Sequence, residues 1–507
     1  MISRLKLDTP DRRADVLVFV AGAATAFAFA PFSVFPLAVL APAALFLSWR
    51  KANAPRAAWR GFLYGAGLFG VGVSWVYVSM HTYGFMPAPL AAFAVALFVA
   101  GLAVFPAAVG WAQARFASLP EGLRFGLVIP ALWTLFEWIR GWFLTGFPWL
   151  NLGYSQSDSP LAGFASWIGV YGMSFAVSMT AGLMVAAWFH RPRVVRYLSA
   201  AVVIWSVAAA AGRIEWVRPA GAPLEVALVQ ANVPIAIKWS PRERDAIIDR
   251  YLRLSEQATQ AQLIVWPEAA IPGAFDPALV PKLEATTHGR GATFLIGAVE
   301  QDLHSRAYYN SVYAVGAQTA SYRKQHLVPF GEFLPLPALF GWLIDHLHIP
   351  MSNFSRGAAG QPLLAAAGHA LGVSVCYEDA FGEEIIQALP QASLLVNVSE
   401  DSWFGDSLAP HQRLQMARIR ALEAGRWMLR AANTGPSAVI DHQGRVVARS
   451  AQFVPEVLSA RAQPMTGATL YARYGNTPIV AVLLLVVFLA AVFGTRRFPV
   501  KSKQFAD

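Results

Sequence analysis

The sequence contains almost no cysteine, since Cys376 is the only one in 507 residues. A single cysteine excludes an internal disulfide and any metal site built from several thiolates. Cys376 lies in the stretch LGVSVCYEDAF, directly after an apolar run typical of a buried strand and before two acidic residues. A lone cysteine is either a small core residue or a reactive thiol, and the motifs elsewhere in the chain decide between these interpretations.

Charged residues are also scarce. They make up 14% of the chain, whereas hydrophobic residues make up 56%, and the mean hydropathy is +0.44. Ordinary soluble domains carry roughly 25% charged residues, so this composition excludes an ordinary soluble protein and indicates a membrane protein. No Asp, Glu, Lys or Arg occurs in 16–49 or in 61–114. Each gap is long enough for two membrane spans of roughly 17–25 residues.

The apolar stretches predict a multi-span α-helical membrane domain of about eight transmembrane helices. Seven fall within 1–212, and the eighth precedes a short tail that ends at 507. A stretch of ordinary polarity, 220–470, lies between the seventh and the eighth and is expected to form a separate domain. The expected spans are 16–31, 33–49, 60–80, 88–111, 124–145, 162–189, 195–212 and 476–494.

Lys and Arg gather in alternate loops between these spans, and the positive-inside rule assigns such loops to the cytoplasm. Both termini are therefore expected in the cytoplasm, and the 220–470 domain in the periplasm, for a protein of the bacterial inner membrane. The net charge of +10 belongs to the membrane half, because 213–473 holds 22 Lys and Arg against 23 Asp and Glu. The excess of Lys and Arg thus reflects the orientation of the chain in the membrane, and it predicts no nucleic-acid partner.

The 220–470 stretch alternates apolar runs with amphipathic segments, which predicts an α/β sheet sandwich. Ser240 and Pro241 are expected to begin a helix, as its N-cap and first residue. Glu268 follows the expected strand LIVW and Cys376 follows LGVSV, so both are expected at one edge of the sheet. The expected strands begin at 224, 261, 292, 311, 371 and 392, and a hairpin is expected from 437.

Three segments concentrate reactive side chains: VWPEAAIP with Glu268, YRKQHLVPFGEF with Lys324 and Glu332, and VCYEDAF with Cys376. A thiol needs a base to become a nucleophile, and a carboxylate whose pKa is raised by burial serves this purpose. A Lys ammonium and a backbone N–H together suit an oxyanion, and the same positive charge favours a thiolate. The segments therefore predict a cysteine nucleophile with a carboxylate base.

These motifs, in this order, resemble the nitrilase (carbon–nitrogen hydrolase) superfamily, and nearly the whole chain resembles its membrane branch, the apolipoprotein N-acyltransferases. The resemblance rests on RGWFLTGFPWLNLGYSQ, QANVPIAIKW, WPEAAIP, KQHLVPFGEFLP, MSNFSRG and SWFGDSLAPHQRLQMARIRALEAGR. It implies a nitrilase-like αββα sandwich for the polar domain. It also implies a Glu-Lys-Cys triad, with Glu268 as general base, Lys324 as oxyanion-binding residue and Cys376 as nucleophile.

The resemblance assigns supporting roles to further residues. Glu332 is expected to orient Lys324 or to assist proton transfer. Tyr377 and Glu378 are expected to shape the site, with the Tyr377 N–H helping to bind the oxyanion. Glu400 stands where the family pattern leads us to expect Asn, a departure that concerns local loop contacts. Aromatic residues on loops near the acyl chains are expected at Trp239, Trp403 and Phe404.

The implied reaction is a two-step, ping-pong acyl transfer. Cys376 takes an acyl chain from a phospholipid, with phosphatidylethanolamine as the preferred donor, and holds it as a thioester. The α-amine of the diacylglyceryl-modified N-terminal cysteine of an apolipoprotein then accepts the chain, which gives a triacylated lipoprotein. The implied partners of this monomer are the phospholipid donor, the diacylated lipoprotein acceptor and membrane lipids, with no metal and no other cofactor.

Simpler interpretations compete with each of these roles. Glu268 alone is typical of a surface or capping acid, and Lys324 beside Arg323 is typical of a solvated basic loop. The three loop aromatics are, by type, more often core residues. His326 is more typical of a structural, hydrogen-bonded histidine than of a catalytic base.

Glu137 and Arg140 lie three residues apart in the expected fifth span, so they share a helix face. Intramembrane charges are functional candidates, and the two interpretations are an ion pair that fixes helix packing and a site for a lipid headgroup.

Two other functions compete for the whole chain. One is a membrane-tethered amidase or nitrilase, although eight spans exceed what a tether requires. The other is a transporter, which the single charged pair and the lack of a detectable repeat disfavour.

Overall fold

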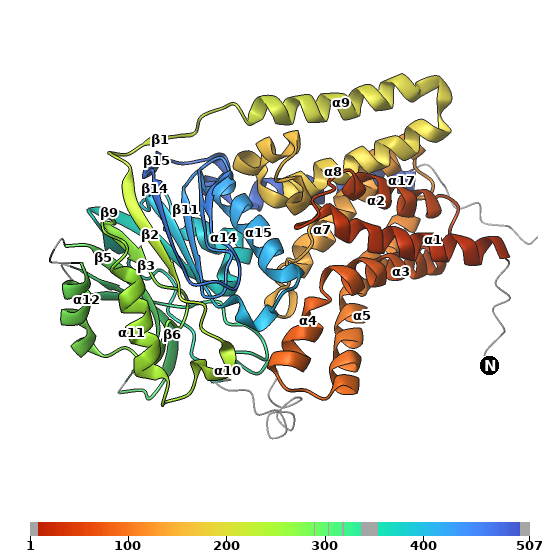
Figure 1. The fold of residues 1–507 in the computed structure, drawn as a ribbon. Coiled ribbons are helices and arrows are strands. Elements are labelled where there is room, and N and C mark those ends of the chain that lie inside the picture. The colour runs from red at the N-terminus through yellow and green to blue at the C-terminus, as the bar shows by residue number, and fades with distance from the viewer. Residues whose placement is uncertain are drawn as a thin grey trace, which may run out of the picture.

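The computed structural model describes residues 9–496 except 288, 290, 303, 317–318 and 336–352. The chain forms a helical half and a half built around β-sheets, which lie side by side (Figure 1). Helix α9 (Val194–Ala211) runs along the top of the molecule in Figure 1 and leads into the first strand of the sheet half.

Helices dominate the first half, whose sequence consists of long apolar runs. In lipid no water is present to bond the backbone N–H and C=O groups, and a helix satisfies them within the segment itself. The helices of this half are α1 (Thr9–Thr25), α2 (Leu37–Ser48), α3 (Ala54–Gly72), α4 (Trp75–Val78), α5 (Ala88–Gln113), α6 (Glu121–Leu123), α7 (Ile129–Arg140), α8 (Ala165–Phe189), α9 and, after the sheets, α17 (Thr477–Arg496).

Four helical stretches of the described chain are long and apolar enough to cross a membrane. A fifth is obtained if the bent pair 54–72 and 75–83 counts as one span. The prediction of about eight spans is therefore not confirmed, because α2 and the apolar part of α17 are shorter than this length. The four stretches are Ala88–Phe116, Glu121–Arg140, Pro160–Phe189 and Arg191–Ala211.

Two expected spans also differ in shape from the prediction. The span expected at 60–80 is two helices bent by 52° across the break between Gly72 and Trp75. The span expected at 124–145 ends as a helix at Arg140, because the chain turns at Gly141 and the Phe147 N–H donates back to the Arg140 carbonyl at 2.8 Å. The segment after Arg140 therefore leaves the α-helix and forms a loop with a short 3₁₀ helix at Phe143–Thr145.

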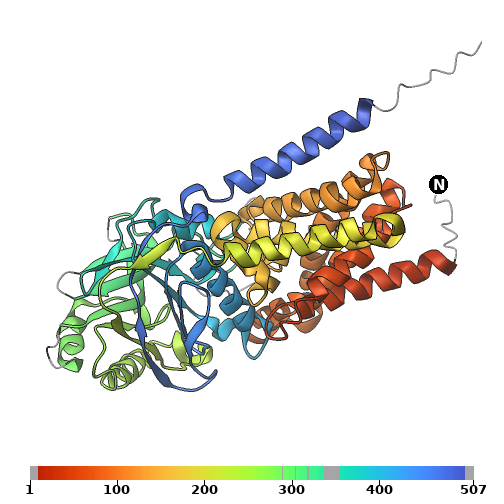
Figure 2. The ribbon, with the colours of Figure 1, turned by 90° about the horizontal axis from the view of Figure 1, so that it is seen from above.

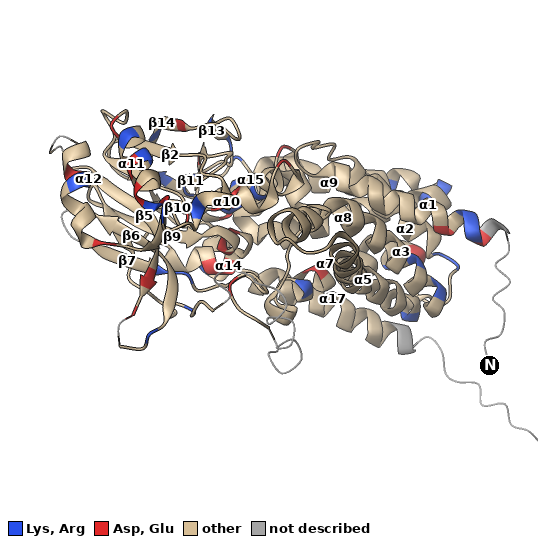
Figure 3. Cartoon of the chain, turned by 60° about the horizontal axis from the view of Figure 1, so that its bottom comes forward, with Lys and Arg blue, Asp and Glu red and all other residues tan. Residues whose placement is uncertain are grey.

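Apolar side chains cover the flanks of the helical half, where Phe93, Leu97 and Trp188 are each more than 60% exposed. Charged residues gather at the end farthest from the sheets and in the sheet half, with few on the flanks between (Figure 3). Helix α1 begins and α17 ends at that same far end (Figure 2). A broad exposed apolar surface of this kind is typical of contact with lipid. The predicted cytoplasmic tail follows 494, and its residues 497–507 lie outside the described part of the chain.

The sheet half holds two large sheets and a two-stranded ribbon in which β1 pairs with β15. One sheet has the order β14-β2-β3-β5-β6-β7, with β4 paired to β5, and the other has the order β13-β12-β11-β10-β9-β8. All six expected strands are confirmed, as β2, β3, β5, β6, β9 and β10, and the expected hairpin is the antiparallel pair β12 and β13. The strands are β1 (Val217–Pro219), β2 (Leu224–Gln230), β3 (Leu263–Val265), β4 (Ile271–Ala274), β5 (Thr293–Gln301), β6 (Tyr308–Val315), β7 (Ala320–Arg323), β8 (Leu364–Ala366), β9 (His369–Val375), β10 (Leu394–Ser399), β11 (Met428–Ala432), β12 (Ala438–Ile440), β13 (Val446–Arg449), β14 (Glu456–Ala462) and β15 (Met465–Gly467).

The two large sheets pack face to face. Their facing side chains form one apolar core, with Val226 and Leu295 from the first sheet and Val375 and Val396 from the second. Helices α11 (Arg244–Ser255) and α12 (Val280–Thr286) cover the outer face of the first sheet. Helices α14 (Gly382–Ile385) and α15 (Leu408–Ala424) cover the outer face of the second. This four-layered αββα arrangement confirms the predicted sandwich.

Helix α11 begins later than predicted. Its first residue is Arg244 and its N-cap position is held by Glu243, so the expectation that Ser240 caps this helix was wrong. Residues 240–243 form a turn instead, in which the Glu243 N–H donates to the Ser240 carbonyl at 3.1 Å.

Helix α15 joins the two halves of the molecule. Leu414 and Ala417 pack toward the second sheet, whereas Met416 and Ile419 pack into the core of the helical half. Because one helix contributes to both cores, the end of the second sheet that carries Cys376 is held against the helices.

Candidate active site

Cys376 stands directly after the end of β9. Its backbone is in the left-handed region, with φ of +51°. This conformation costs of order 1–3 kcal/mol for a residue other than glycine and is typical of functional sites. The Glu378 carboxylate accepts the Val375 N–H at 2.6 Å, and Asn397 Nδ2 donates to the Cys376 carbonyl at 3.3 Å. These two contacts hold the tight turn that carries the thiol.

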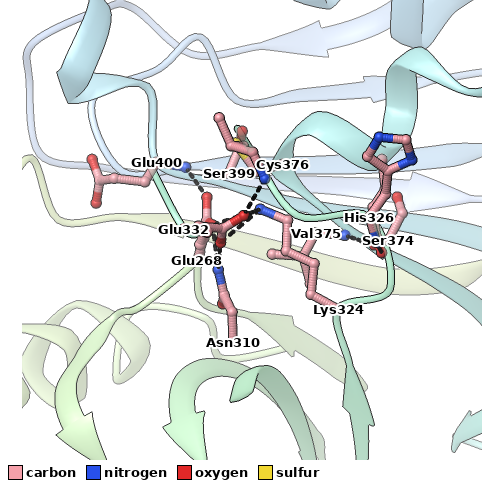
Figure 4. Close-up of polar contacts among 12 residues, drawn as sticks. Glu268, Asn310, Lys324, His326, Glu332, Ser374, Val375, Cys376, Ser399 and Glu400 are labelled. Carbon is pink, nitrogen blue, oxygen red and sulfur yellow. Dashed lines mark hydrogen bonds and ion pairs between the residues drawn. The ribbon is translucent and has the colours of Figure 1, made fainter. Parts of the chain in front are cut away.

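The other two residues of the predicted triad approach Cys376 from the opposite sheet. Glu268 follows β3 and Lys324 follows β7, both in the first sheet, whereas β9 belongs to the second. The expectation that Glu268 and Cys376 share one edge of a single sheet was therefore wrong. They lie at matching ends of two packed sheets, and the site forms between these ends (Figure 4).

A buried cluster of charges joins Glu268 to Lys324. Lys324 Nζ lies 3.6 Å from Glu268 Oε1 and 2.8 Å from Glu332 Oε2. Asn310 Nδ2 donates to Glu268 at 2.7 Å and to Glu332 at 2.8 Å. The Glu400 N–H donates to Glu268 Oε2 at 2.8 Å. Both oxygens of the Glu268 carboxylate are thus bound, which fixes the orientation of the candidate base (Figure 4).

The charges around the cluster set its protonation. Burial lowers the pKa of Lys324, but the negative charges of Glu332 and Glu268 outweigh burial and raise this pKa above its ordinary value. Burial, aided by the charge of Glu268, raises the pKa of the Cys376 thiol to about 12, while Arg413 and Lys324 oppose the shift. The resting thiol is therefore protonated at neutral pH and needs a base before it can attack.

Alkylation of Cys376 by iodoacetamide is expected to be slow at neutral pH and to rise about tenfold per pH unit up to about pH 9. The alkylation rate rises with pH because the pKa of the thiol is raised. At every pH below that pKa, the reactive thiolate fraction grows tenfold per pH unit. Since the chain has no other cysteine, intact mass after timed alkylation reports this site alone. A rate that levels off below about pH 8 would show a depressed thiol pKa instead.

Glu378 ties the segment after β7 to the turn at Cys376. Its carboxylate accepts the N–H groups of Gln325 at 2.6 Å and His326 at 3.0 Å, in addition to that of Val375. Burial raises the pKa of Glu378 to about 7. These contacts fix the segment that carries the lysine relative to the turn that carries the thiol.

The imidazole of His326 is engaged in contacts of its own. Its Nδ1 lies 2.7 Å from Glu384 Oε1, and its ring stacks on Phe381 with centroids 3.8 Å apart. Both contacts fit the structural interpretation of this histidine rather than a role as base.

Tyr377, beside Cys376, points to the helical half. Its OH donates to the Gly146 carbonyl at 2.8 Å, and its ring stacks on Trp149 with centroids 6.3 Å apart. Both partners belong to the loop after α7. The side of the site that carries Cys376 therefore faces the apolar helices.

Two of the three predicted loop aromatics also contact the helical half. Ser79 Oγ donates to the Trp403 carbonyl at 2.9 Å, and the Phe404 ring meets Trp75 edge to face with centroids 5.0 Å apart. Trp239 follows the short helix α10 (Ile235–Lys238) and is half-buried. The loop of Trp403 and Phe404 thus forms part of the junction between the halves.

Glu137 and Arg140 share a face of α7, yet no ion pair joins them among the contacts of the described residues. Arg140 donates to the Phe147 carbonyl at 2.8 Å and to Asn151 Oδ1 at 2.6 Å, and Glu137 accepts the Leu152 N–H at 3.0 Å. Both charges therefore fasten the loop after α7, which favours the packing role over headgroup binding.

A second buried ion pair lies beside Glu268, between Lys238 and Glu400. Lys238 Nζ also donates to the Glu268 backbone carbonyl at 3.1 Å, and the Glu400 carboxylate accepts Asn433 Nδ2 at 3.1 Å. Burial lowers the pKa of Lys238 to about 7, against the opposing negative charge of Glu268. Lys238 is not among the residues predicted from the sequence, although a Lys in the apolar run AIKW signals a buried charge that needs a partner.

Lys238→Met is expected to lower the free energy of unfolding by about 3–5 kcal/mol, because the Glu400 carboxylate would stay buried without its partner. The midpoint of thermal unfolding in detergent measures the loss. The matched control is the double variant Lys238→Met, Glu400→Gln, which removes both charges and should recover most of the loss. Equal losses in the single and double variants would rule out the ion pair as the cause.

Arg413 is a second site residue that was not predicted from the sequence. It is buried on α15, and its Nη1 lies 3.5 Å from the Cys376 sulfur. Arg413, Met416 and Arg420 share one helix face by their spacing of three and seven residues. The signal available was an Arg that recurs on the helix face that also carries Met416.

Models of two families match this chain. One, described as Apolipoprotein N-acyltransferase N-terminal domain, matches 21–183, and the other, described as Carbon-nitrogen hydrolase, matches 225–471. The apolipoprotein N-acyltransferase of Nitrosomonas europaea is 44% identical over 95% of this chain and 98% of the relative. The apolipoprotein N-acyltransferase of Methylococcus capsulatus is 43% identical over 97% of this chain and 98% of the relative. The crystal structure of Saccharomyces cerevisiae Nit3, a member of branch 10 of the nitrilase superfamily, aligns with 50% of this chain and 93% of its own, at 19% identity and a TM-score of 0.38.

Proposed function

The chain belongs to the apolipoprotein N-acyltransferase family, and we propose that it transfers an acyl chain from a phospholipid to the N-terminal cysteine of lipoproteins. The donor class is phosphatidylethanolamine, and the acceptor is the α-amine of a diacylglyceryl-modified cysteine. One observation carries the proposal: the charged pair Glu268 and Lys324 lies buried beside a strained cysteine, at the end of the sheets that packs against apolar helices.

In the first step, Glu268 takes the proton of the Cys376 thiol, and the sulfur attacks the ester carbonyl of the phospholipid. Lys324, held by Glu332, binds the oxyanion together with the backbone N–H of Tyr377. The carbon–oxygen bond then breaks, the glycerol oxygen takes the proton from Glu268, and lysophospholipid leaves. The acyl chain remains on Cys376 as a thioester.

In the second step, the α-amine of the lipoprotein attacks the thioester, and Glu268 takes a proton from the nitrogen. The carbon–sulfur bond breaks, and the sulfur receives the proton from Glu268. The amide product leaves and the free thiol is restored. The loop aromatics Trp239, Trp403 and Phe404 cover the site, because water that reached the thioester would hydrolyse it.

The same proposal places the molecule in the bacterial inner membrane. The helices of 1–212 and the helix at 476–494 form about eight spans, the termini are cytoplasmic, and the catalytic domain at 220–470 is periplasmic. Both lipid substrates are anchored in the outer leaflet, so the site must face the bilayer. The contact of Tyr377 with the loop after α7 supports this placement. The protein acts as a monomer, and Glu137 and Arg140 hold that loop in position.

The test supplies purified protein in detergent with phosphatidylethanolamine and a synthetic diacylated lipopeptide. We expect a triacylated lipopeptide and an equal amount of lysophospholipid, measured by mass spectrometry. Hydrolysis of small amides without acylation of the lipopeptide would favour the amidase alternative and overturn the proposal.

A further inference from the structure

The guanidinium of Arg413 is the only cationic group for which a contact with the Cys376 sulfur is present in the part of the chain that the structure describes. Its Nη1 points at the sulfur at 3.5 Å, within the range of a hydrogen bond to sulfur. The Arg413 side chain is 1% exposed, so its guanidinium is shielded from bulk water, whereas Cys376 is half-buried. Lys324 has different partners, because its ammonium is bound by the carboxylates of Glu332 and Glu268.

Arg413 is held in place by its other contacts. Asp401 Oδ1 lies 2.6 Å from Nη1 and Asp379 Oδ2 lies 3.2 Å from Nη2, and Ser399 Oγ accepts a further bond. Arg430 binds the second oxygen of Asp401 at 2.6 Å. The two arginines, Arg413 and Arg430, thus offset the charges of the two aspartates, Asp379 and Asp401. A planar guanidinium fixed at both ends presents its N–H in one direction, which a flexible ammonium does not.

We propose that Arg413 is a further catalytic residue, which binds the sulfur of Cys376 whenever that sulfur carries negative charge. The inference rests on the proposed function, in which the thiol loses its proton to Glu268 in the first step and the sulfur leaves as a thiolate in the second. A neutral thiol is a weak acceptor, whereas a thiolate makes a charge-assisted hydrogen bond. The contact therefore strengthens as the reaction proceeds, which is the condition for lowering a barrier.

This assignment divides the two cations of the site between two developing charges. Lys324 serves the carbonyl oxygen of the donor, and Arg413 serves the sulfur. Because the guanidinium stays charged at every working pH, its support of the thiolate does not vary with pH. The charge of Arg413 partly offsets two effects that disfavour the thiolate, namely the burial of the Cys376 thiol and the negative charge of Glu268.

The test measures the alkylation of Cys376 by iodoacetamide at about pH 8, where the rate follows the thiolate fraction. Because Arg413→Met alone would leave Asp379 unpaired, the double variant Arg413→Met, Asp379→Asn is compared with Asp379→Asn. We expect the double variant to alkylate at least tenfold more slowly, with its acylation by phospholipid reduced to the same degree. Equal alkylation rates within twofold, even with acylation lost, would overturn the proposal and leave Arg413 a structural role.

Arg413→Lys provides a second readout that does not depend on the double variant. It keeps a positive charge but loses the planar fork, so we expect at least a threefold lower alkylation rate, measured well below the thermal midpoint of the variant. If the double variant fails to fold, this variant decides, and an unchanged rate overturns the proposal. Absence of acylation in the wild type would contradict the proposed function, whereas the alkylation comparison would still decide the role of Arg413.

Discussion

Cys376→Ala is expected to abolish acylation of the lipopeptide, with a loss of about 10⁴-fold or more. No other thiol exists in the chain to take its place. Alanine is small enough for the left-handed backbone at this position, and the contacts of the turn come from Glu378 and Asn397. The fold should therefore persist. The rate of lipopeptide acylation and the thermal midpoint are measured on the same preparation.

The control for this prediction is Cys376→Ser. Its hydroxyl is a far weaker nucleophile, so it should be nearly inactive too, although a slow ester adduct on the serine is chemically allowed. Acylation by Cys376→Ala at more than a few per cent of the wild-type rate would contradict a covalent intermediate on this residue.

Lys324→Met is expected to have the second largest effect, and it acts through two physical terms. Loss of an oxyanion-binding group costs about 10²–10³ in rate. Loss of a buried cation between two carboxylates costs about 3–5 kcal/mol in the free energy of unfolding, because Glu332 and Glu268 lie within 4 Å of its Nζ. Acylation rate and thermal unfolding are both measured.

The double variant Lys324→Met, Glu332→Gln separates the two terms. It removes one of the stranded carboxylates, so much of the stability should return. The rate should not return, because no group replaces the ammonium at the oxyanion. Recovery of the rate together with stability would mean that Lys324 serves only to hold the site together.

The sequence predicted the sheet half well, because its signals are local. The runs before Glu268 and Cys376 are short, apolar and bounded by turn residues, and each is a buried strand. The order of strands and helices was sufficient for the αββα sandwich. Sequence alone did not reveal that the two residues stand on opposite sheets, because that depends on which strands pair across long stretches of chain.

The parts of the site that the sequence missed depend on contacts between distant segments. Arg413 reads as an ordinary helix charge until α15 is placed over the turn at Cys376. Lys238 becomes meaningful only when Glu400, 162 residues further on, is seen beside it. The predicted number of about eight spans is not confirmed, for a related reason. Composition marks apolar runs, but the bend after Gly72 and the loop after Arg140 come from packing and from returning hydrogen bonds.

The most direct test of the central claim is the intact mass of the full-length wild-type protein after incubation with a phosphatidylethanolamine of one known acyl chain. The account predicts a gain equal to one acyl group on Cys376, absent from Cys376→Ala and released when the diacylated lipopeptide is added. Consumption of the donor and acylation of the lipopeptide, with no adduct on Cys376 at any time, would contradict it.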